Sequence, residues 1–230
     1  MIRQYAVRFV TLICGLMFCA LGSYFVVSAA NIGIGAWETF HLGLSRTTGI
    51  AYGDCAVITS VAIIVIDFLL KGKIGFGTVL NGVLIGKFTG FIMAHMDFLP
   101  PAQSLPVGII YILTGQFLLG CGGVIYMSRA MGCGPRDTLM VVIGQRFPNA
   151  PIGLVRFFMD LGVFVIGVLM GGPFGFGTLV AMGMNSTVMQ TVYKITSFEP
   201  RKVRHEDIPY TLGVWSGKNE SLFTGKIANR

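Results

Sequence analysis

The stretch "GCGPRDTLM" at residues 132–140 repeats, with changes, the earlier stretch "GIGAWETFH" at residues 33–41. Both contain a Gly-x-Gly-x-x-acid-Thr motif. A second match follows each motif: "GFGT" occurs at residues 75–78 and again at residues 175–178. Because four identical residues recur at the same place in two apolar halves, the pattern indicates an internal duplication of the chain.

The composition is typical of a membrane protein. Of 230 residues, 53% are hydrophobic and only 12% are charged, about half of the roughly 25% charge of a soluble domain. Only helices or closed barrels satisfy their backbone hydrogen bonds in lipid, and the apolar blocks lack an alternation of period two, so we predict an all-α, polytopic membrane helical bundle. Six blocks approach the roughly 20 residues that a span requires: residues 6–30, 52–70, 78–97, 105–128, 152–170 and 177–196.

Basic residues predict the side of the membrane on which each connection lies. They precede the first block and follow the second, fourth and sixth blocks, which is the positive-inside pattern. Both termini are therefore expected in the cytoplasm, provided that residues 36–48 do not cross the membrane. The net charge of +7 is located between the spans, so we predict no nucleic-acid partner. The basic residues that give this pattern are Arg3, Arg8, Lys71, Lys73, Arg129, Arg136, Arg146, Lys194, Arg201, Lys202 and Arg204, whereas Arg46 alone is expected on the outer side.

The two halves are expected to be inverted relative to each other. Each contains three predicted spans, an odd number, so the second half enters from the opposite side of the membrane. We predict a first transmembrane repeat at residues 1–98, a second at residues 99–198 and a polar cytoplasmic tail at residues 199–230. Each repeat has an extra short, non-spanning helix after its first span. Many secondary transporters have this architecture, with the site at the repeat interface.

The doubled order of motifs resembles a known family. A Gly-x-Gly-x-x-acid motif, a span, a "GxGT" turn and another span occur twice within residues 6–196, as in the bacterial YczE/YyaS/YitT group of integral membrane proteins. The resemblance implies this architecture and a location in the bacterial cytoplasmic (inner) membrane. It implies no activity, and it leaves out the tail.

The Gly-x-Gly motifs predict the short helices. The glycines allow a sharp exit from the preceding span, Ala36 and Pro135 suit a first helical position, and an acid two residues later favours the positive end of the helix dipole. Two interpretations of Glu38 and Asp137 remain open. They only start their helices, or they act as gates or cation sites at opposite mouths of the protein.

The residues beside these acids have interfacial interpretations. Trp37 is suited to anchoring at the membrane interface, and Arg136, at the aligned position, is suited to pairing with a lipid phosphate.

The "GFGT" stretches are interpreted as turns that open the third span of each half. Thr78 and Thr178 are the expected N-caps. A helix start of this kind, if sunk below the interface, would also offer backbone N–H groups to an anion. The glycines that make the two turns are Gly75, Gly77, Gly175 and Gly177.

Ionisable residues deep in the spans give the sharpest signal, because each costs about 2.5 to 3.5 kcal/mol at the bilayer centre. Lys87 and Asp160 lie near the middle of their spans, and Arg156 is one helical turn from Asp160. We predict that these three form a buried charge cluster between the halves. It is either a neutralised structural lock or a site that recruits an anionic group. Asn81 and Asn185 are expected to bond a substrate or a neighbouring helix.

Three other acids lie near span ends, and we expect them to be solvated boundary residues. They are Asp54, Asp67 and Asp97.

The motifs exclude several enzyme classes. The chain contains no Walker loop, HExxH or GxSxG motif, and its five cysteines form no CxxC pair, so we expect no enzyme, cofactor or metal site. The protein is predicted to be a transporter that is embedded in the lipid bilayer. It is expected to move an ion or a small anionic or zwitterionic molecule. The alternative is an accessory or regulatory membrane protein whose tail, expected to be mobile, docks a cytoplasmic partner through Trp215.

Overall fold

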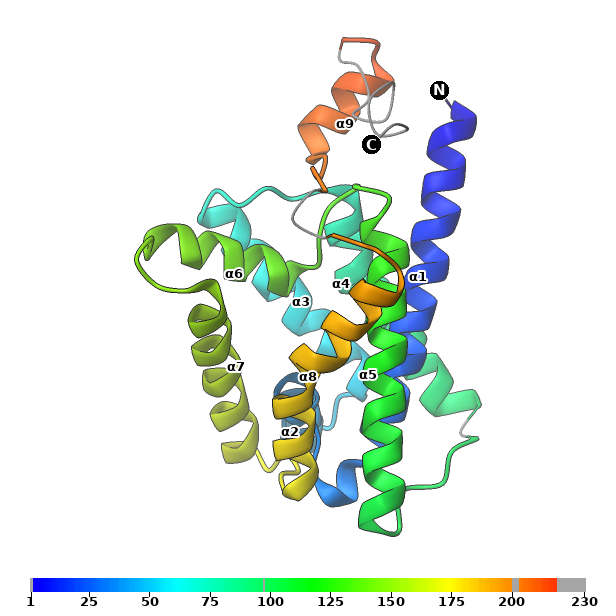
Figure 1. Ribbon diagram of the computed structural model, residues 1–230, viewed down its shortest axis with the longest axis vertical. Helices are drawn as coiled ribbons and strands as arrows, with labels where there is room; N and C mark the ends of the chain where they lie inside the picture. Colours follow the sequence, from blue (N-terminus) through cyan, green and yellow to red (C-terminus); the bar gives the residue numbers. More distant parts are fainter. Residues whose placement is uncertain (1, 97, 200–202, 219–230) are drawn as a thin grey trace.

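The computed structural model describes residues 2–96, 98–199 and 203–218 (Figure 1). This part of the chain is helical and contains no strand. The elements, in order, are α1 (Ile2–Ser28), η1 (Ala30–Ile32), α2 (Ala36–Thr48), α3 (Tyr52–Leu69), α4 (Phe76–His95), α5 (Leu105–Met127), α6 (Pro135–Arg146), α7 (Ile152–Leu169), α8 (Phe176–Ile195) and α9 (Ile208–Trp215).

All six predicted apolar blocks are helices, namely α1, α3, α4, α5, α7 and α8. Within the described residues, four stretches are long and apolar enough to cross a membrane: Arg3–Ser28, Tyr52–Leu69, Phe76–His95 and Leu105–Met127. The helices α7 and α8 are comparable in length. Helix α7 carries Arg156 and Asp160, and α8 carries Asn185, Ser186 and Gln190. The short helices also form as predicted, with Ala36 and Pro135 as their first residues.

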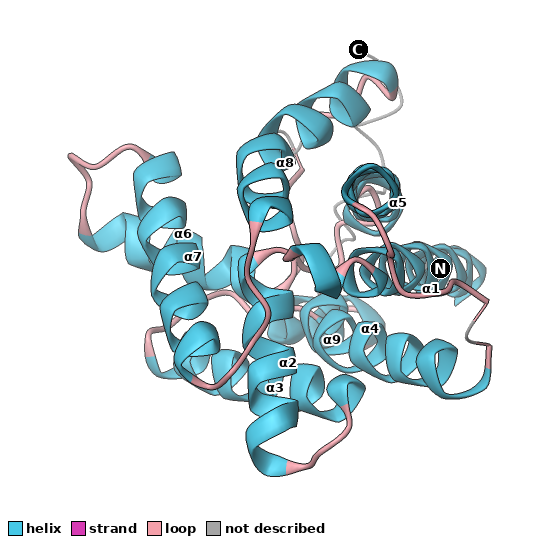
Figure 2. Cartoon of the chain, turned by 90° about the horizontal axis from the view of Figure 1, so that it is seen from below, coloured by secondary structure: helices cyan, strands magenta, loops and turns pink. Residues whose placement is uncertain are grey.

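The most extensive packing between two helices joins the antiparallel pair of α1 and α5 (Figure 1). Small residues allow their backbones to approach closely. A Cβ atom added at Gly15 would lie 2.7 Å from the backbone nitrogen of Tyr126, and one added at Gly22 would lie 2.6 Å from the oxygen of Gly115. Figure 2 shows α5 end-on beside α1, with α4 packed against α1 and α8 packed against α5.

The short helices are exchanged between the halves. Helix α2 of the first half packs against α7 of the second, and α6 of the second half packs against α3 of the first. Each short helix therefore contacts the middle long helix of the other half as well as that of its own half. This exchange interlocks the two halves of the chain.

The exchange is accompanied by two glycine crossings, places where backbone segments of the two halves pass in close contact at a glycine residue. Gly33, at a φ of 94°, lies on the turn formed by Gly175 and Thr178. Gly132, at a φ of 126°, lies on the turn of Gly75 and Thr78, where an added Cβ would be 2.6 Å from Thr78 Oγ1. Each half thus places its Gly-x-Gly segment on the "GFGT" turn of the other half.

Thr78 and Thr178 are not the N-cap residues that we predicted. The N-cap residues are Gly75 and Gly175, and the threonines lie three residues further on. The backbone N–H of Gly75 donates to Thr78 Oγ1 at 3.2 Å, and that of Gly175 donates to Thr178 Oγ1 at 3.3 Å. The crossing chain is close enough to require glycine at the cap itself: a Cβ at Gly75 would touch Met131, and one at Gly175 would lie 2.5 Å from the oxygen of Ile32.

The two halves differ in the packing of their last helices. Helix α3 packs along α4, whereas α7 and α8 pack far less closely. Gly82, Gly86 and Gly90 line α4 at every fourth position, and a Cβ at Gly86 would lie 2.6 Å from the oxygen of Gly53 on α3. The corresponding positions of α8 carry Met182, Ser186 and Gln190, which leave no comparable stripe of small residues.

Residues 203–218 of the tail are not part of a mobile extension, although the composition suggested one for the whole tail. In the described segment, residues 203–218, helix α9 lies at the end of the bundle where α1 begins (Figure 1). Val214 of this helix is fully buried and belongs to a hydrophobic cluster with Leu12 and Met131. The tail docks because the bundle supplies the apolar surface that the tail lacks by itself.

The crossings predict a large effect of a small substitution. Gly132→Ala should destabilise the folded protein by about 2 to 5 kcal/mol, because the positive φ and the close contact each add strain. Thermal unfolding in detergent measures this loss. The matched control is Gly183→Ala in α8, where an added Cβ meets nothing within 4 Å and alanine should gain about 0.5 to 1 kcal/mol. Equal melting temperatures for the two variants would contradict the crossing.

Candidate functional site

Five side chains from three helices form what we call the central polar cluster. They come from α2, α6 and α7, which the exchange of short helices brings together. Trp37 Nε1 donates to Asp160 Oδ1 at 2.8 Å, and the guanidinium of Arg136 lies 4.2 Å from the centre of the Trp37 ring. The members of the cluster are Trp37, Arg136, Asp137, Arg156 and Asp160.

Arg156 connects the two carboxylates of the cluster. Its Nη1 lies 3.9 Å from Asp137 Oδ1, and its Nε lies 3.7 Å from Asp160 Oδ2. With Arg136, the cluster has two cations and two anions. The side chains of Arg156, Asp137 and Asp160 are 44%, 32% and 22% exposed. These ion pairs are therefore loose and partly exposed.

Side chains that follow the two Gly-x-Gly motifs are in contact, although the glycines themselves lie at crossings on opposite ends of the bundle (Figure 1). Trp37 of the first motif contacts Arg136 of the second. The reason is the exchange of α2 and α6, which places the start of each helix inside the other half. Glu38 stays at the start of its own helix, where Oε2 would lie 2.6 Å from a Cβ at Gly35.

The predicted cluster of Lys87, Arg156 and Asp160 does not form as a unit. Arg156 and Asp160 are neighbours, but Lys87 Nζ pairs with Asp54 Oδ1 at 2.6 Å. The side chains of Lys87 and Asp54 are 59% and 47% exposed, so this pair lies on the outside of α3 and α4. The packing of α7 against α2 and α6 directs its charges toward those helices and away from α4.

The two asparagines of the prediction lie in different places. Asn81 is beside the start of α6, since its Oδ1 would be 3.3 Å from a Cβ at Gly134. Tyr126 reaches the same point with its hydroxyl, at 3.4 Å. Asn185 is half-buried on α8, one turn after Ala181, which is packed in a cluster with Ile112 of α5. Asn81 therefore lies beside the start of α6, the helix that carries two residues of the central polar cluster. Asn185 lies on α8, next to the contact between α5 and α8.

His41 is a site residue that the sequence analysis missed. It is 1% exposed, and neither ring nitrogen has a hydrogen-bond partner among the described residues. Its ring lies 6.5 Å from that of Trp37 and 5.7 Å from that of Tyr52. The signal was present in "GIGAWETFH", because His41 follows Trp37 by four positions and so shares its helix face.

The surroundings of His41 keep its imidazole neutral. Burial, and secondarily the positive charge of Arg136, lowers its pKa well below the usual value of 6.5. A neutral imidazole has one donor and one acceptor nitrogen. Each buried polar group without a partner costs about 1 to 3 kcal/mol. Such a group beside the charge cluster is a candidate for binding a polar ligand.

Asp67 is not the solvated boundary residue that we predicted. It is fully buried, and within the described chain neither carboxylate oxygen has a hydrogen-bond partner. The cause is α6, which covers this end of α3: a Cβ at Gly72 would lie 3.0 Å from Val142 and 3.1 Å from Thr138. Asp97 lies outside the described residues.

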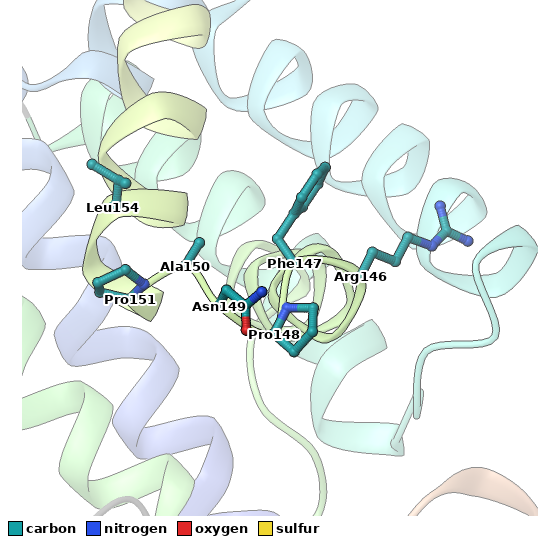
Figure 3. A pocket seen from close by; sticks show the side chains of 7 residues that line it. All are labelled: Arg146, Phe147, Pro148, Asn149, Ala150, Pro151 and Leu154. Carbon is teal, nitrogen blue, oxygen red and sulfur yellow. The ribbon is translucent and has the colours of Figure 1, made fainter.

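A separate hollow of about 480 Å³ lies at the connection between α6 and α7 (Figure 3). No residue of the central polar cluster lines it, so the hollow is not the candidate site. Its lining residues are Arg146, Phe147, Pro148, Asn149, Ala150, Pro151 and Leu154.

Comparisons with known proteins confirm the resemblance to the YczE/YyaS group. A family model described as a family of unknown function (DUF6198) matches residues 6–194. The "Uncharacterized membrane protein YczE" of Bacillus subtilis is 30% identical over 190 residues, which cover 82% of this chain and 86% of the relative. An "Uncharacterized protein" of Haemophilus influenzae is 31% identical over 185 residues, 80% of each chain. The "Uncharacterized protein YyaS" of Bacillus subtilis is 23% identical, covering 79% of this chain and 90% of the relative. No solved structure matches the chain.

The environment of His41 predicts how stability depends on pH. Because its pKa is lower in the folded than in the unfolded protein, its contribution favours folding above pH 6.5 and weakens as the pH falls below that value. His41→Phe should remove this dependence and keep or raise the melting temperature at pH 7.5, since no buried nitrogen remains unpaired. Thermal unfolding between pH 5 and 8 tests both effects. A large loss of stability at pH 7.5 would show that the imidazole makes essential hydrogen bonds.

Proposed function

The chain belongs to the DUF6198 family, and we propose that it is a secondary transporter of a small anionic or zwitterionic molecule. In this proposal it is not an enzyme and uses no cofactor. It has six spans, formed by α1, α3, α4, α5, α7 and α8, which make two inverted three-span repeats. Both termini face the cytoplasm, and the membrane is the bacterial inner membrane. The similarity to YczE of Bacillus subtilis, described as a membrane protein, supports a location in a membrane.

Matched contacts in the two halves support the inverted repeat. Gly33 lies on the turn of Gly175 just as Gly132 lies on the turn of Gly75. The exchange of α2 and α6 has the same form in both directions, and the leading helices α1 and α5 run antiparallel (Figure 1). A second half that enters from the opposite side of the membrane accounts for all three features.

The observation that carries the proposal is the meeting of two helix starts at the central polar cluster. Helix α2 begins at Ala36 and α6 begins at Pro135, and their second residues, Trp37 and Arg136, are in contact. Secondary transporters with inverted repeats bind their substrates where interrupted helices meet near the midplane. Charged side chains at such a depth are costly unless they face protein or water, and they usually serve function.

The chemistry of the cluster favours a ligand that carries a carboxylate or similar anion. Arg136 and Arg156 can donate to an anionic group, with a planar geometry that suits carboxylates. Asp160 and the face of the Trp37 ring suit a cationic group on the same molecule. A zwitterion can therefore replace the existing loose ion pairs with its own charges. This exchange would allow binding without leaving a buried charge unpaired.

The alternative, an accessory protein that docks a partner through Trp215, has less support. The Trp215 ring stacks on Phe76 with centroids 5.3 Å apart, and it meets Tyr5 edge-on at 5.8 Å. Two neighbours in the same chain therefore already use this side chain.

Thermal unfolding against a panel of amino acids, organic anions and inorganic ions tests the proposal. A ligand at 100 times its dissociation constant should add about 2.7 kcal/mol to the free energy of unfolding. Asp160→Asn and Arg136→Gln should abolish the shift. The matched control is Lys87→Gln, which removes an exposed ion pair worth about 0 to 1 kcal/mol and should leave the shift intact.

Uptake into liposomes then separates a transporter from a binding protein. The ligand found in the panel should accumulate when the wild-type protein is reconstituted, and it should not accumulate with Asp160→Asn. Binding without any uptake or exchange would contradict the transporter.

A further inference from the structure

The tail is fastened to the first helix by a buried ion pair. Arg8 Nη1 lies 2.9 Å from Glu206 Oε1, and the two side chains are 6% and 0% exposed. Tyr5 and Thr211 donate their hydroxyl groups to Glu206 Oε2 at 3.0 and 3.1 Å. The ion pair therefore has the added hydrogen bonds that a buried charge requires.

The same contacts hold a loop between helices. Arg8 also donates to the carbonyl oxygen of Arg129, from Nε at 3.1 Å and from Nη2 at 2.8 Å. The backbone N–H of Glu206 donates to the oxygen of Ala130 at 2.7 Å. The connection between α5 and α6 is thus bound from two directions, by α1 and by the tail.

The tail also holds the turn that this loop crosses. The backbone N–H of Ile208 donates to the oxygen of Ile74 at 2.9 Å. A Cβ at Gly75 would lie 2.6 Å from the oxygen of Glu206 and also touch Met131. Residues 203–208 therefore lie where the segment of Gly132 crosses the segment of Gly75. They form hydrogen bonds to both of these segments.

The equivalent crossing at the other end of the bundle repeats the contact between Gly75 and Met131, but it lies away from α9 (Figure 1). There Gly175 lies against Ile32 of η1, with the oxygen of Ile32 2.5 Å from an added Cβ. The backbone contacts of Glu206 and Ile208 lie at the first crossing. The family match ends at residue 194, so the tail adds this difference to a core in which the two crossings correspond.

We propose that residues 203–218 are a lock that holds this end of the bundle closed, and that Arg8 and Glu206 must separate before it opens. Movement of α6 relative to α4 would pull Gly132 away from Gly75, and the tail bonds to the chain on both sides of that contact. Two-state elements of this kind are released when one charge of a pair is neutralised or captured by another partner. The lock goes beyond the transport proposal, since it requires no particular substrate.

Cys133 is a natural reporter of this opening. It is the residue after Gly132, and its Sγ lies 3.2 Å from Thr138 Oγ1. Cys133 is half-buried, and this burial raises the pKa of its thiol to about 11. The closed protein should therefore react slowly with a maleimide, because the thiolate is the nucleophile. Opening of the crossing should expose the thiol and increase the rate.

The experiment measures the maleimide labelling rate of the full chain in detergent, with Cys133 as its single cysteine. Glu206→Gln should raise the rate about tenfold or more. Lys218→Gln, an exposed substitution of a charge in the same segment, should leave it unchanged. A second protein with Cys55 alone reports unfolding, because Cys55 is fully buried and should stay unlabelled in both variants.

An unchanged Cys133 rate in Glu206→Gln would overturn the lock, and so would an equal rise at Cys55, which would make the tail a brace for the whole fold. If Glu206→Gln does not fold, Trp215→Ala, which removes the stacking on Phe76, takes its place with the same expected outcomes. No ligand is added, so failure of this experiment leaves the transport proposal standing, and failure to find a ligand leaves the lock standing.

Discussion

The close contact of backbone with backbone at the two glycine crossings is the constraint on which the structure depends. Gly33 and Gly132 each lie against a turn of the other half, at separations that a Cβ atom would prevent. Because the segments cross there, α2 and α6 each continue into the opposite half. The position of every charged residue in the central polar cluster follows from that exchange, as does the short distance between two motifs that are far apart in the sequence.

The cluster shows how an apolar bundle accommodates charge. Trp37 donates a hydrogen bond to Asp160 and presents its ring face to Arg136. One side chain therefore offsets part of the free-energy cost of removing two charges from water. Arg156 lies between two carboxylates at distances close to 4 Å, which leaves capacity for another partner. His41 lies behind this surface with no partner for its ring nitrogens among the described residues. Such an arrangement is better suited to exchanging ligands than to stabilising the fold.

Local sequence patterns predicted the elements, and long-range packing determined the site. The two Gly-x-Gly motifs and the two "GFGT" turns predicted the start of each short helix and the order of the long ones. The partner of Lys87 was not predictable, because it depends on which helix lies beside α4. Likewise, Glu206 is in a polar tail, and only the fold places it beside Arg8 at the other end of the chain. His41 was within reach of sequence reasoning, since its spacing from Trp37 is helical.

A double-mutant cycle between Trp37 in the first half and Asp160 in the second tests the central claim, that the halves exchange their short helices and meet at the polar cluster. The unfolding free energies of Trp37→Phe, Asp160→Asn and the double variant are compared with that of the wild type. The hydrogen bond between these residues predicts a coupling energy of about 1 to 3 kcal/mol. Effects that add to within about 0.3 to 0.5 kcal/mol would place the two side chains apart and contradict the exchange.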